Sequence, residues 1–540
     1  MIPVGFRPIV MFSAFAVLCA DALAAADAGV WPVRTNQVGF EPDAPKFCTA
    51  SNPPLPTFVL QRAGEDIRWH TVYEGRWLDA PSGSGLKIGD FSARAEPGDY
   101  RILLSTNGLD RFDMPDWRPG LQSYHFQIRH GVYDTVERLL FGYVILQRCG
   151  DDLGWAGRCH QDPVPLVDAQ GRAVRTIDVR GGYHQSCDLR CWHDGMSMSF
   201  YALLRYAELR RPVWDRGAVA AEIRRGCDYF LKVLSPEGYV HDAQFVPLGW
   251  GARRYYIAPA TLGAQCNVAM LFARASCFFR ATDVAYADRL LAAARRLWAQ
   301  IETNPFFAEF RPAPEKGLPP GAQPAETCYR RQFRTSAAGL SERAAVALEL
   351  FRATRDSGLA ATAKRLAREH FAAVEKEGDA AFSDWSYCHD ISGRRMTVEL
   401  VREFGDAEWR RALSDKVTGL VRRLRARDMC PDRDVNAVLT SHCAAHAILL
   451  TEAAGLLGRP DLREYAQRSF DWVLGANPWN ASHVEGVGQN QWQRPVFGQF
   501  FPSTPQLPGG VLHVPNGEYD MPPTMMTLWA CAVLRDGCML

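Results

Sequence analysis

The chain has 540 residues, of which 47% are hydrophobic and 22% are charged. That length and balance predict a well-folded globular protein with two domains, one of them large. The formal net charge at pH 7 is +1, with acidic and basic residues interspersed. No strongly basic surface is implied, so we expect neither nucleic acid nor an anionic membrane as a partner.

The N-terminus has the pattern of an export signal. Arg7 precedes an apolar run that starts at Val10, and small residues suited to cleavage follow, with cleavage expected after Ala24 or Ala26. We therefore expect residues 1–26 to be a signal peptide and the protein to be periplasmic or secreted. The apolar run is too short to span a bilayer and no later segment is long enough, so we expect a soluble protein with no membrane insertion.

Residues 30–128 have the pattern of a small β-sandwich. Short β-rich runs, such as FVLQR from Phe58 and YRILLS from Tyr100, are separated by clusters of Pro, Gly and Ser. Short strands at this spacing are typical of a sandwich.

From residue 131 onward the pattern is helical. Apolar residues recur at helical spacing in segments 223–234 and 462–474, and we predict roughly a dozen helices in all. Those outside these two segments are 131–148, 194–210, 262–281, 284–302, 337–354, 358–375, 407–426, 434–456 and 521–534. Paired helices in this number suit a closed toroid. A superhelical array would need a fixed-period repeat, which the sequence lacks.

Several stretches follow one another in the order of a known enzyme family. They are RTNQVGFEPDAPKF from Arg34, DFSARAEPGDYRI from Asp90, LQRCG ending at Gly150, IDVRGGYHQSCD ending at Asp188, EIRRGCDYFLK from Glu222 and WVLGANPWNASHVEGVG from Trp472. Together they resemble glycoside hydrolase family 9, the inverting cellulases and related enzymes. The resemblance implies a mostly α fold, an (α/α)6 toroid barrel at residues 131–540 preceded by an immunoglobulin-like β-sandwich at residues 30–128.

The same resemblance implies the catalytic residues. In the family, a loop after a Gly-Gly-aromatic opening carries two aspartates, and the second is the catalytic base. On GGYHQSCD the second falls on Asp188 and the first on Gln185. The general acid is a Glu just before the last barrel helix, where Glu518 stands, with Asp520 as the other acidic residue nearby. The implied activity is inverting hydrolysis of a β-linked glycan in an open cleft, without an organic cofactor.

Inverting hydrolysis needs two carboxyl groups in opposite protonation states. One protonates the leaving oxygen and the other deprotonates a water on the far face of the sugar, so they stand roughly 6.5–9.5 Å apart. Asp188 and Glu518 are distant in sequence, but a closed toroid brings its first and last helices together. An apolar setting supplied by Tyr519, Met521 and Trp529 would help to keep Glu518 protonated.

Two departures from the family pattern bear on specificity. Gln185 replaces the first aspartate, and an amide can orient a water but cannot accept its proton. Family cellulases carry a His-His-Arg segment where this chain has QNQWQRPVFGQF, so Trp492 and Arg494 are the candidate substrate-binding residues, together with Gln185. These departures indicate weaker hydrolysis, exo action or a β-glycan other than cellulose. A catalytically weakened carbohydrate-binding protein on the same fold is the alternative.

Cys149, Cys159, His160 and His184 form a second constellation. Two thiolates and two imidazoles are a complete tetrahedral ligand set for structural zinc, and some family members hold a structural zinc at the positions that these residues match. The other interpretation is a Cys149–Cys159 disulfide beside two unrelated histidines, since exported proteins readily form such bridges. A bound zinc would hold the loop that continues through Gln185.

Other groups in this stretch have ordinary explanations beside the chemical ones. His193 and Asp194 are expected at the start of a helix, where Asp is a common cap, although both residue types can do acid–base chemistry. Cys187 and Cys191 could pair within a short, strained loop. A polysaccharide lyase on the same barrel would need a Tyr or His base near a group that neutralises a uronate, and no motif demands it.

Overall fold

The computed structural model describes residues 33–536 apart from several gaps. The gaps are residues 54, 67, 105–121, 154, 156–157, 168–172, 188–190, 210–215, 242, 246–255, 258–261, 304–335, 378–394, 433, 493–506 and 516. The expected signal peptide at residues 1–26 lies outside the described residues, as do Asp188 and Arg494.

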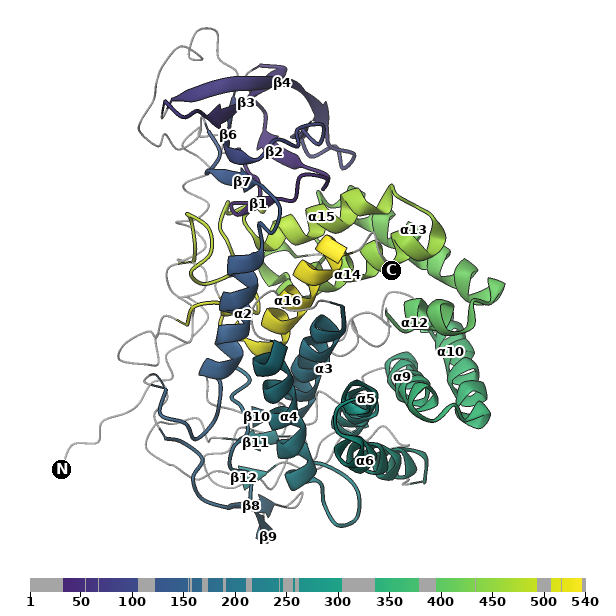
Figure 1. Ribbon diagram of the computed structural model, residues 1–540. Coiled ribbons are helices and arrows are strands. Elements are labelled where there is room, and N and C mark those ends of the chain that lie inside the picture. The colour runs from purple at the N-terminus through teal and green to yellow at the C-terminus, as the bar shows by residue number, and fades with distance from the viewer. Residues whose placement is uncertain are drawn as a thin grey trace, which may run out of the picture.

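The N-terminal part is a curled sheet of seven strands in the order β1-β7-β6-β3-β4-β5-β2 (Figure 1). The strands are β1 (Gly39–Phe40), β2 (Phe47–Ser51), β3 (Thr57–Ala63), β4 (Trp69–Asp79), β5 (Leu86–Asp90), β6 (Gly98–Leu104) and β7 (Phe126–Ile128). The long strand β4 joins two layers, because its first part pairs with β3 and its last three residues pair with β5. Phe40 packs edge-on against Phe91 and Phe126 in the core between the layers, with ring centroids 5.5 and 5.6 Å away.

Twelve helices follow in the described part of the chain. They are α2 (Asp134–Leu146), α3 (His193–Leu209), α4 (Arg216–Val233), α5 (Leu262–Phe279), α6 (Val284–Thr303), α9 (Ser336–Thr354), α10 (Ser357–Glu377), α12 (Arg395–Phe404), α13 (Ala407–Ala426), α14 (Thr440–Leu457), α15 (Leu462–Val473) and α16 (Met521–Asp536).

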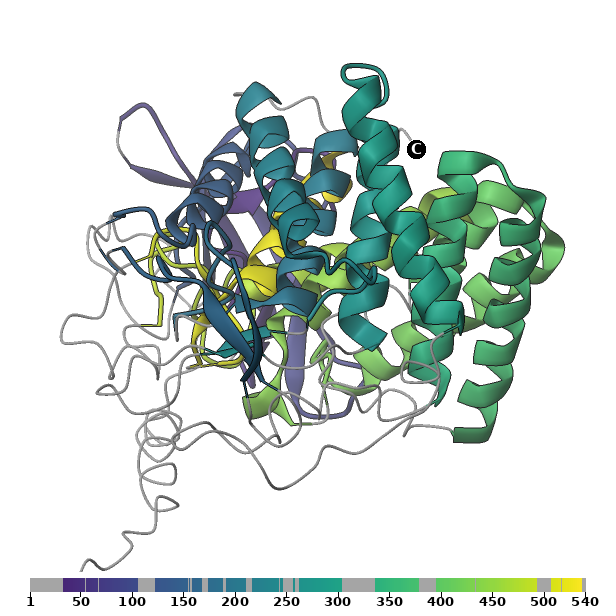
Figure 2. The ribbon, with the colours of Figure 1, turned by 90° about the horizontal axis from the view of Figure 1, so that it is seen from below.

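Six of these helices close into an inner ring (Figures 1 and 2). Around the ring, α3 contacts α5, α5 contacts α9, α9 contacts α12, α12 contacts α14, α14 contacts α16, and α16 returns to α3. Helices α4, α6, α10, α13, α15 and α2 are the outer partners of α3, α5, α9, α12, α14 and α16 in turn. Inner helices are buried all round, as α14 is from Thr440 to Ala454, whereas the outer helix α13 buries a single apolar stripe. The predicted (α/α)6 toroid is confirmed.

Helix α5 corrects one expectation from the sequence. By length and composition alone it could cross a membrane, although no such segment was expected after the N-terminus. It packs between α3 and α9, and 78% of its apolar window is buried. Its hydrophobicity is therefore that of a central core helix.

Short strands decorate the barrel and position its loops. One sheet contains β8 (Val164–Val167), β9 (Ala173–Ile177), β10 (Cys191–Trp192), β11 (Ala243–Phe245) and β12 (Tyr256–Ile257), and a separate hairpin contains β13 (Val511–Leu512) and β14 (Tyr519–Asp520). The hairpin leads directly into α16, so its side chains lie where the ring closes on α3.

A buried polar network fixes the sheet to the barrel. Asn36, which precedes β1, donates to Asp471 Oδ1 on α15 (2.8 Å) and to the Tyr133 hydroxyl (3.2 Å). Gln467 donates to the same two groups, at 2.7 and 3.1 Å. Burial raises the pKa of Asp471 to about 7, because the hydrogen bonds from Gln467 and Asn36 only partly offset the loss of water.

Candidate active site

The closure of the barrel brings the GGYHQSC loop against the hairpin before α16. Ser186 pairs with Asp520 as an antiparallel β-bridge, and the Met521 amide donates to the Gln185 carbonyl at 2.8 Å. The Cys187 thiol lies 4.0 Å from the carbonyl oxygen of Tyr519. Segments more than 330 positions apart are thus held together by main-chain hydrogen bonds, as a closed toroid requires.

The other end of the loop is fixed to the first barrel helix. Tyr183 pairs with Arg148 just after α2, and their side chains share a partner in buried Glu222 on α4. The Tyr183 hydroxyl donates to Glu222 Oε1 at 2.5 Å, and Arg148 Nε donates to the same oxygen at 3.1 Å. The loop is therefore anchored on both sides of His184 and Gln185.

Gln185 faces a carboxylate. Its Nε2 donates to Asp520 Oδ2 over 3.4 Å, and His513 Nδ1 lies 3.7 Å from the same oxygen. All three side chains are buried. Gln185 Oε1 has no hydrogen-bond partner among the described residues, and it lies so close to Gly195 of α3 that a Cβ there would be only 2.1 Å away.

Glu518 directly precedes β14 and Asp520 ends it, and the Glu518 carbonyl accepts a hydrogen bond from the His513 amide at 2.8 Å. The Tyr519 hydroxyl donates to Glu485. Burial first, and then nearby groups that include both carboxylates, raise the pKa of Tyr143 far above its ordinary value. Two acidic side chains therefore lie near one buried phenol at the end of the barrel.

The residues predicted from the sequence are only partly described. The structure brings Glu518 and Gln185 to the same end of the barrel, whereas Asp188 and Arg494 lie outside the described residues. Asp520 was named from the sequence only as a neighbour of Glu518, and its contact with Gln185 is a finding of the structure. No sequence pattern pointed to His513, whose role depends on the hairpin register.

Trp492 is half-buried in an aromatic cluster that also contains Trp472, Trp479 and His483. Trp479 contacts Trp492 at 5.4 Å between centroids, and His483 lies 6.2 Å from Trp492. Burial lowers the pKa of His483 to about 3, so its ring is neutral near pH 7. The Leu512 amide donates to the His483 carbonyl at 2.9 Å, which places the cluster beside the β13–β14 hairpin. The contacts of Trp479 and His483 with Trp492 were not predicted, although both residues lie within the WVLGANPWNASHVEGVG stretch.

His193 and Asp194 begin α3, as the cap interpretation expected. The His193 ring lies between the His241 carbonyl (2.6 Å) and the Tyr229 hydroxyl (2.8 Å). Burial lowers its pKa to about 4, which favours a neutral structural histidine. The Gly195 amide donates to Asp194 Oδ1 at 2.6 Å.

Cys149, Cys159, His160 and His184 converge as a possible metal site, with one ligand atom from each and all four atoms within 4.8 Å of one another. The Cys149 and Cys159 sulfurs are 3.6 Å apart, and Cys159 Sγ lies 3.0 Å from His184 Nε2. Both cysteines are free, so the alternative of a Cys149–Cys159 disulfide is not what the structure contains. Two sulfurs on one tetrahedral zinc stand about 3.8 Å apart, given Zn–S bonds near 2.3 Å.

The surroundings of these four residues fit a cation. The contact with Cys149, together with burial, raises the pKa of the Cys159 thiol to about 12, so a positive charge is needed to hold it as a thiolate. The Cys149 amide donates to the Gly182 carbonyl and the His184 amide to the Gln147 carbonyl, both at 2.8 Å, so two ligands lie on segments joined by the Arg148–Tyr183 bridge. His160 has a positive φ of 50°, which is uncommon for a residue with a side chain. The donor set and its positions suit zinc.

The chain thus combines a curled sheet with a closed barrel of six helix pairs, and acidic residues lie where the ring closes. A family model of glycosyl hydrolase family 9 matches residues 133–498, and one of the cellulase N-terminal ig-like domain matches residues 30–108. The chain therefore belongs to glycosyl hydrolase family 9 and is a glycoside hydrolase by class.

Individual relatives are distant but span most of the chain. A cellodextrinase of Butyrivibrio fibrisolvens is 22% identical over 503 residues, 86% of each chain. A thermostable endoglucanase of Alicyclobacillus acidocaldarius, solved as a single mutant, has a TM-score of 0.72 at 18% identity, covering 93% of this chain and 99% of its own. A zinc-binding triple mutant of the family 9 endoglucanase J30 has a TM-score of 0.68 at 19% identity, covering 92% and 99%.

Proposed function

We propose that the protein is an exported, inverting hydrolase of a β-linked glucan or oligosaccharide, with Asp188 as the base and Glu518 as the acid. The observation that carries the proposal is the pairing of the GGYHQSC loop with β14, which brings the chain just before Asp188 to the hairpin that bears Glu518. A cellodextrinase and endoglucanases among the relatives support the substrate class.

In this mechanism each residue has a separate task. Glu518 protonates the leaving oxygen, and Asp188 takes a proton from the water that attacks the opposite face of the sugar. Gln185 cannot take the proton of that water, because a carboxamide can accept a hydrogen bond but is not a base at ordinary pH. Its Nε2 donates to Asp520 instead. Trp479 and Trp492 offer half-buried aromatic faces to a sugar ring, and Arg494 would supply a polar contact.

A structural zinc is the second part of the proposal. Cys149, Cys159, His160 and His184 would hold it, and it would supply a fixed tetrahedral crosslink rather than a reacting centre. This crosslink would tie the loop at its His184 end, one residue before Gln185. The zinc-binding mutant of a family 9 endoglucanase supports the compatibility of this fold with the metal.

The test is hydrolysis of cello-oligosaccharides with the anomeric form of the product followed by NMR. Asp188→Asn and Glu518→Gln should each lower kcat by about 10³-fold with the fold intact. Asp415→Asn, an exposed acidic position on α13, is the matched control and should change nothing. Normal turnover in Asp188→Asn, or retained configuration in the product, would refute the assignment.

The alternative is a protein that binds β-glycans with little turnover, and the observation that favours it is the amide at Gln185 facing Asp520. Oligosaccharide binding by the wild-type chain without products would establish it. The two outcomes are distinguished in one experiment, since binding and product formation are measured on the same sample.

A further inference from the structure

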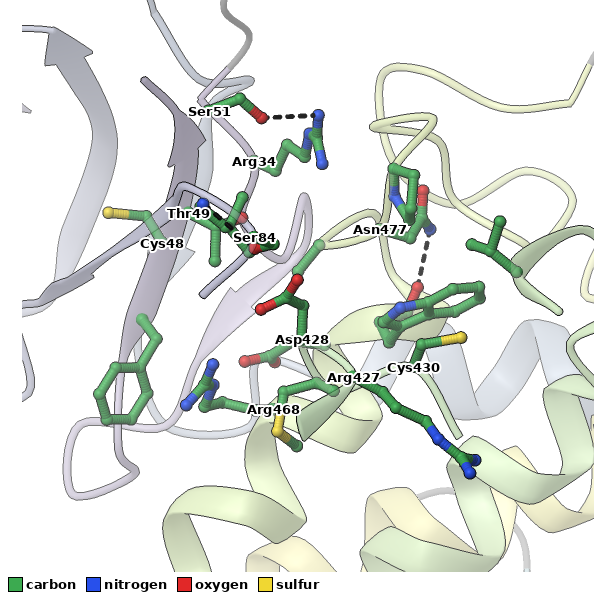
Figure 3. Close-up of a pocket in the computed structure, with 18 of the residues that line it drawn as sticks. Arg34, Cys48, Thr49, Ser51, Ser84, Arg427, Asp428, Cys430, Arg468 and Asn477 are labelled. Carbon is green, nitrogen blue, oxygen red and sulfur yellow. Dashed lines mark hydrogen bonds between the residues drawn. The ribbon is translucent and has the colours of Figure 1, made fainter. Parts of the chain in front are cut away.

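A cavity of about 650 Å³ lies between the curled sheet and the barrel (Figure 3). Its walls come from β2 and the start of β5 on the sheet side, and from residues 427–435 and 468–478 on the barrel side. Gln185, Glu518 and Asp520 do not line it, so it is separate from the proposed active site. Its volume is in the range of small-molecule sites, which is about 300–1,000 Å³.

Two arginines that line this cavity, Arg34 and Arg427, form no ion pair with a carboxylate among the described residues. Arg34, just ahead of β1, makes one long contact to the Ser51 hydroxyl (3.4 Å), and its buried Nε has no hydrogen-bond partner among the described residues. Burial lowers the pKa of Arg34, and the charge of Asp428 across the cavity opposes that shift without forming an ion pair. Arg427 likewise forms no ion pair within the described part of the chain. Unmatched buried donors cost free energy unless a ligand or water accepts their hydrogen bonds.

An acceptor, Asp428, lies on the barrel side of the cavity, across from Arg34. Asp428 accepts a hydrogen bond from Ser82 of the β4–β5 turn through Oδ1, which leaves Oδ2 for another donor. Asp428 and the next residue, Met429, have positive φ angles of 50° and 68°. Two such residues in succession are strained. Asp428 lies on the barrel side of the cavity and Arg34 on the sheet side (Figure 3).

The balance of charge decides the class of ligand. Three arginines and four aspartates line the cavity, and one of the aspartates, Asp471, has its pKa raised to about 7 by burial. An isolated anion or cation would meet repulsive as well as attractive charges there. A neutral polyhydroxyl compound, which both donates and accepts hydrogen bonds, matches alternating guanidinium, carboxylate and amide groups, with Trp472 and Leu86 as apolar walls.

We propose that this cavity is an accessory binding site for a short neutral oligosaccharide, held chiefly by Arg34, Arg427 and Asp428. The site goes beyond the proposed function, although the choice of a β-glucan as its ligand rests on that function.

The site also borders the aromatic cluster. Asn477, in the cavity wall, donates from Nδ2 to the carbonyls of Trp472 (2.8 Å) and Ala481 (2.7 Å), and its Oδ1 accepts from the Trp479 amide (3.2 Å). The turn that presents Trp479 to Trp492 is therefore built on a residue that an accessory ligand would touch.

The experiment is titration calorimetry with cellotetraose in the full-length Asp188→Asn variant, in which turnover is suppressed. Two binding events per chain are expected. Arg34→Met should weaken one of them at least tenfold and leave the other unchanged. Arg427→Met should do the same, and because its guanidinium has no ion-pair partner among the described residues, the fold should tolerate the change. Arg62→Met, an exposed arginine of the same sheet outside the cavity, is the control and should keep both events.

Each outcome is decisive. A single event that Arg34→Met and Arg427→Met leave intact overturns the accessory site but not the proposed function. A single event that both variants abolish supports the accessory site and counts against substrate binding in the cleft. No binding in a protein with wild-type thermal stability overturns the accessory site.

Discussion

Gln185 and Asp520 stand 335 positions apart in sequence, and a hydrogen bond of 3.4 Å joins their side chains where the barrel closes. The amide is the donor and the carboxyl group is the acceptor, and both side chains are buried. An aspartate at position 185 would place a second carboxylate against Asp520. The presence of Asp520 therefore explains why this loop carries an amide at position 185, where the family resemblance implies an aspartate.

We predict that Gln185→Asp, which restores the family residue, destabilises the protein near neutral pH. Two buried carboxylates in contact repel when both are ionised, and the expected cost is about 3 kcal/mol of unfolding free energy. The penalty should grow as the pH rises above about 4, the ordinary range of carboxyl groups, and vanish below it. Urea denaturation at several pH values measures this dependence.

The double variant Gln185→Asp/Asp520→Asn separates the charge effect from simple misfit. It restores one carboxylate and one amide in exchanged positions, so most of the lost stability should return, with a coupling energy of about 1–3 kcal/mol. Additive losses in the double variant would show that the two side chains do not interact as described.

We predict that a chelator lowers the thermal stability of the protein as purified. A metal present at about 1,000 times its Kd stabilises the folded state by about 4 kcal/mol, and chelation removes that contribution. Elemental analysis should find one zinc per chain, and Cys159→Ser should lose it. Cys277→Ser, at an exposed free thiol, is the control. Full stability in chelator, with no metal in the protein, would count against the site.

The barrel could be predicted from the sequence because its helices carry their own signals. Segment 462–474 was predicted from apolar residues at helical spacing and is found as Leu462–Val473. Helix boundaries were harder to predict where most residues are apolar, because no helical alternation of apolar and polar residues is then visible. Helix α14 was expected from residue 434 but begins at Thr440. Ahead of it, Asp432 Oδ2 accepts a hydrogen bond from the Leu439 amide, and Asp432 Oδ1 lies 2.8 Å from His442 Nδ1.

The candidate site was predictable only where residues cluster in sequence. The cysteine and histidine set was found from residue type and spacing, because its ligands lie within 36 positions of one another, from Cys149 to His184. The Gln185–Asp520 contact, the His513 contact and the Trp479–Trp492 pair depend on how loops meet after the ring closes. No local pattern encodes those distances, so they required the structure.

We predict that Asp471 makes stability fall as the pH rises from about 4 to about 7. Its pKa in the folded protein is raised to about 7 by burial, above the ordinary value near 3.9. In that window the unfolded chain has released the proton and the folded chain retains it, so unfolding is favoured as the pH rises; above about 7 the slope from this group disappears.

Asp471→Asn should make the slope of unfolding free energy against pH smaller, by an amount that corresponds to at most one bound proton. The variant keeps Oδ1 for Asn36 and Gln467, and places its NH₂ at Oδ2, which has no hydrogen-bond partner among the described residues. The measurement is the free energy of unfolding from pH 4.5 to 8 for both proteins. Asp415→Asn, at an exposed position, should keep the wild-type slope, and identical slopes for Asp471→Asn and the wild type would contradict the assignment.

We predict that Gly195→Ala impairs activity although alanine is the better helix former. In an open helical position the change stabilises by about 1 kcal/mol, but a Cβ at Gly195 would lie 2.1 Å from Gln185 Oε1 and displace that amide from Asp520. A shift of this size beside the reacting groups should lower kcat by about 10²-fold. Gly142→Ala on α2, where a Cβ meets nothing within 4 Å, is the control and should leave kcat unchanged while raising Tm. If both variants gain the same Tm and keep the wild-type kcat, the position of the Gln185 amide does not depend on the absence of a Cβ at Gly195.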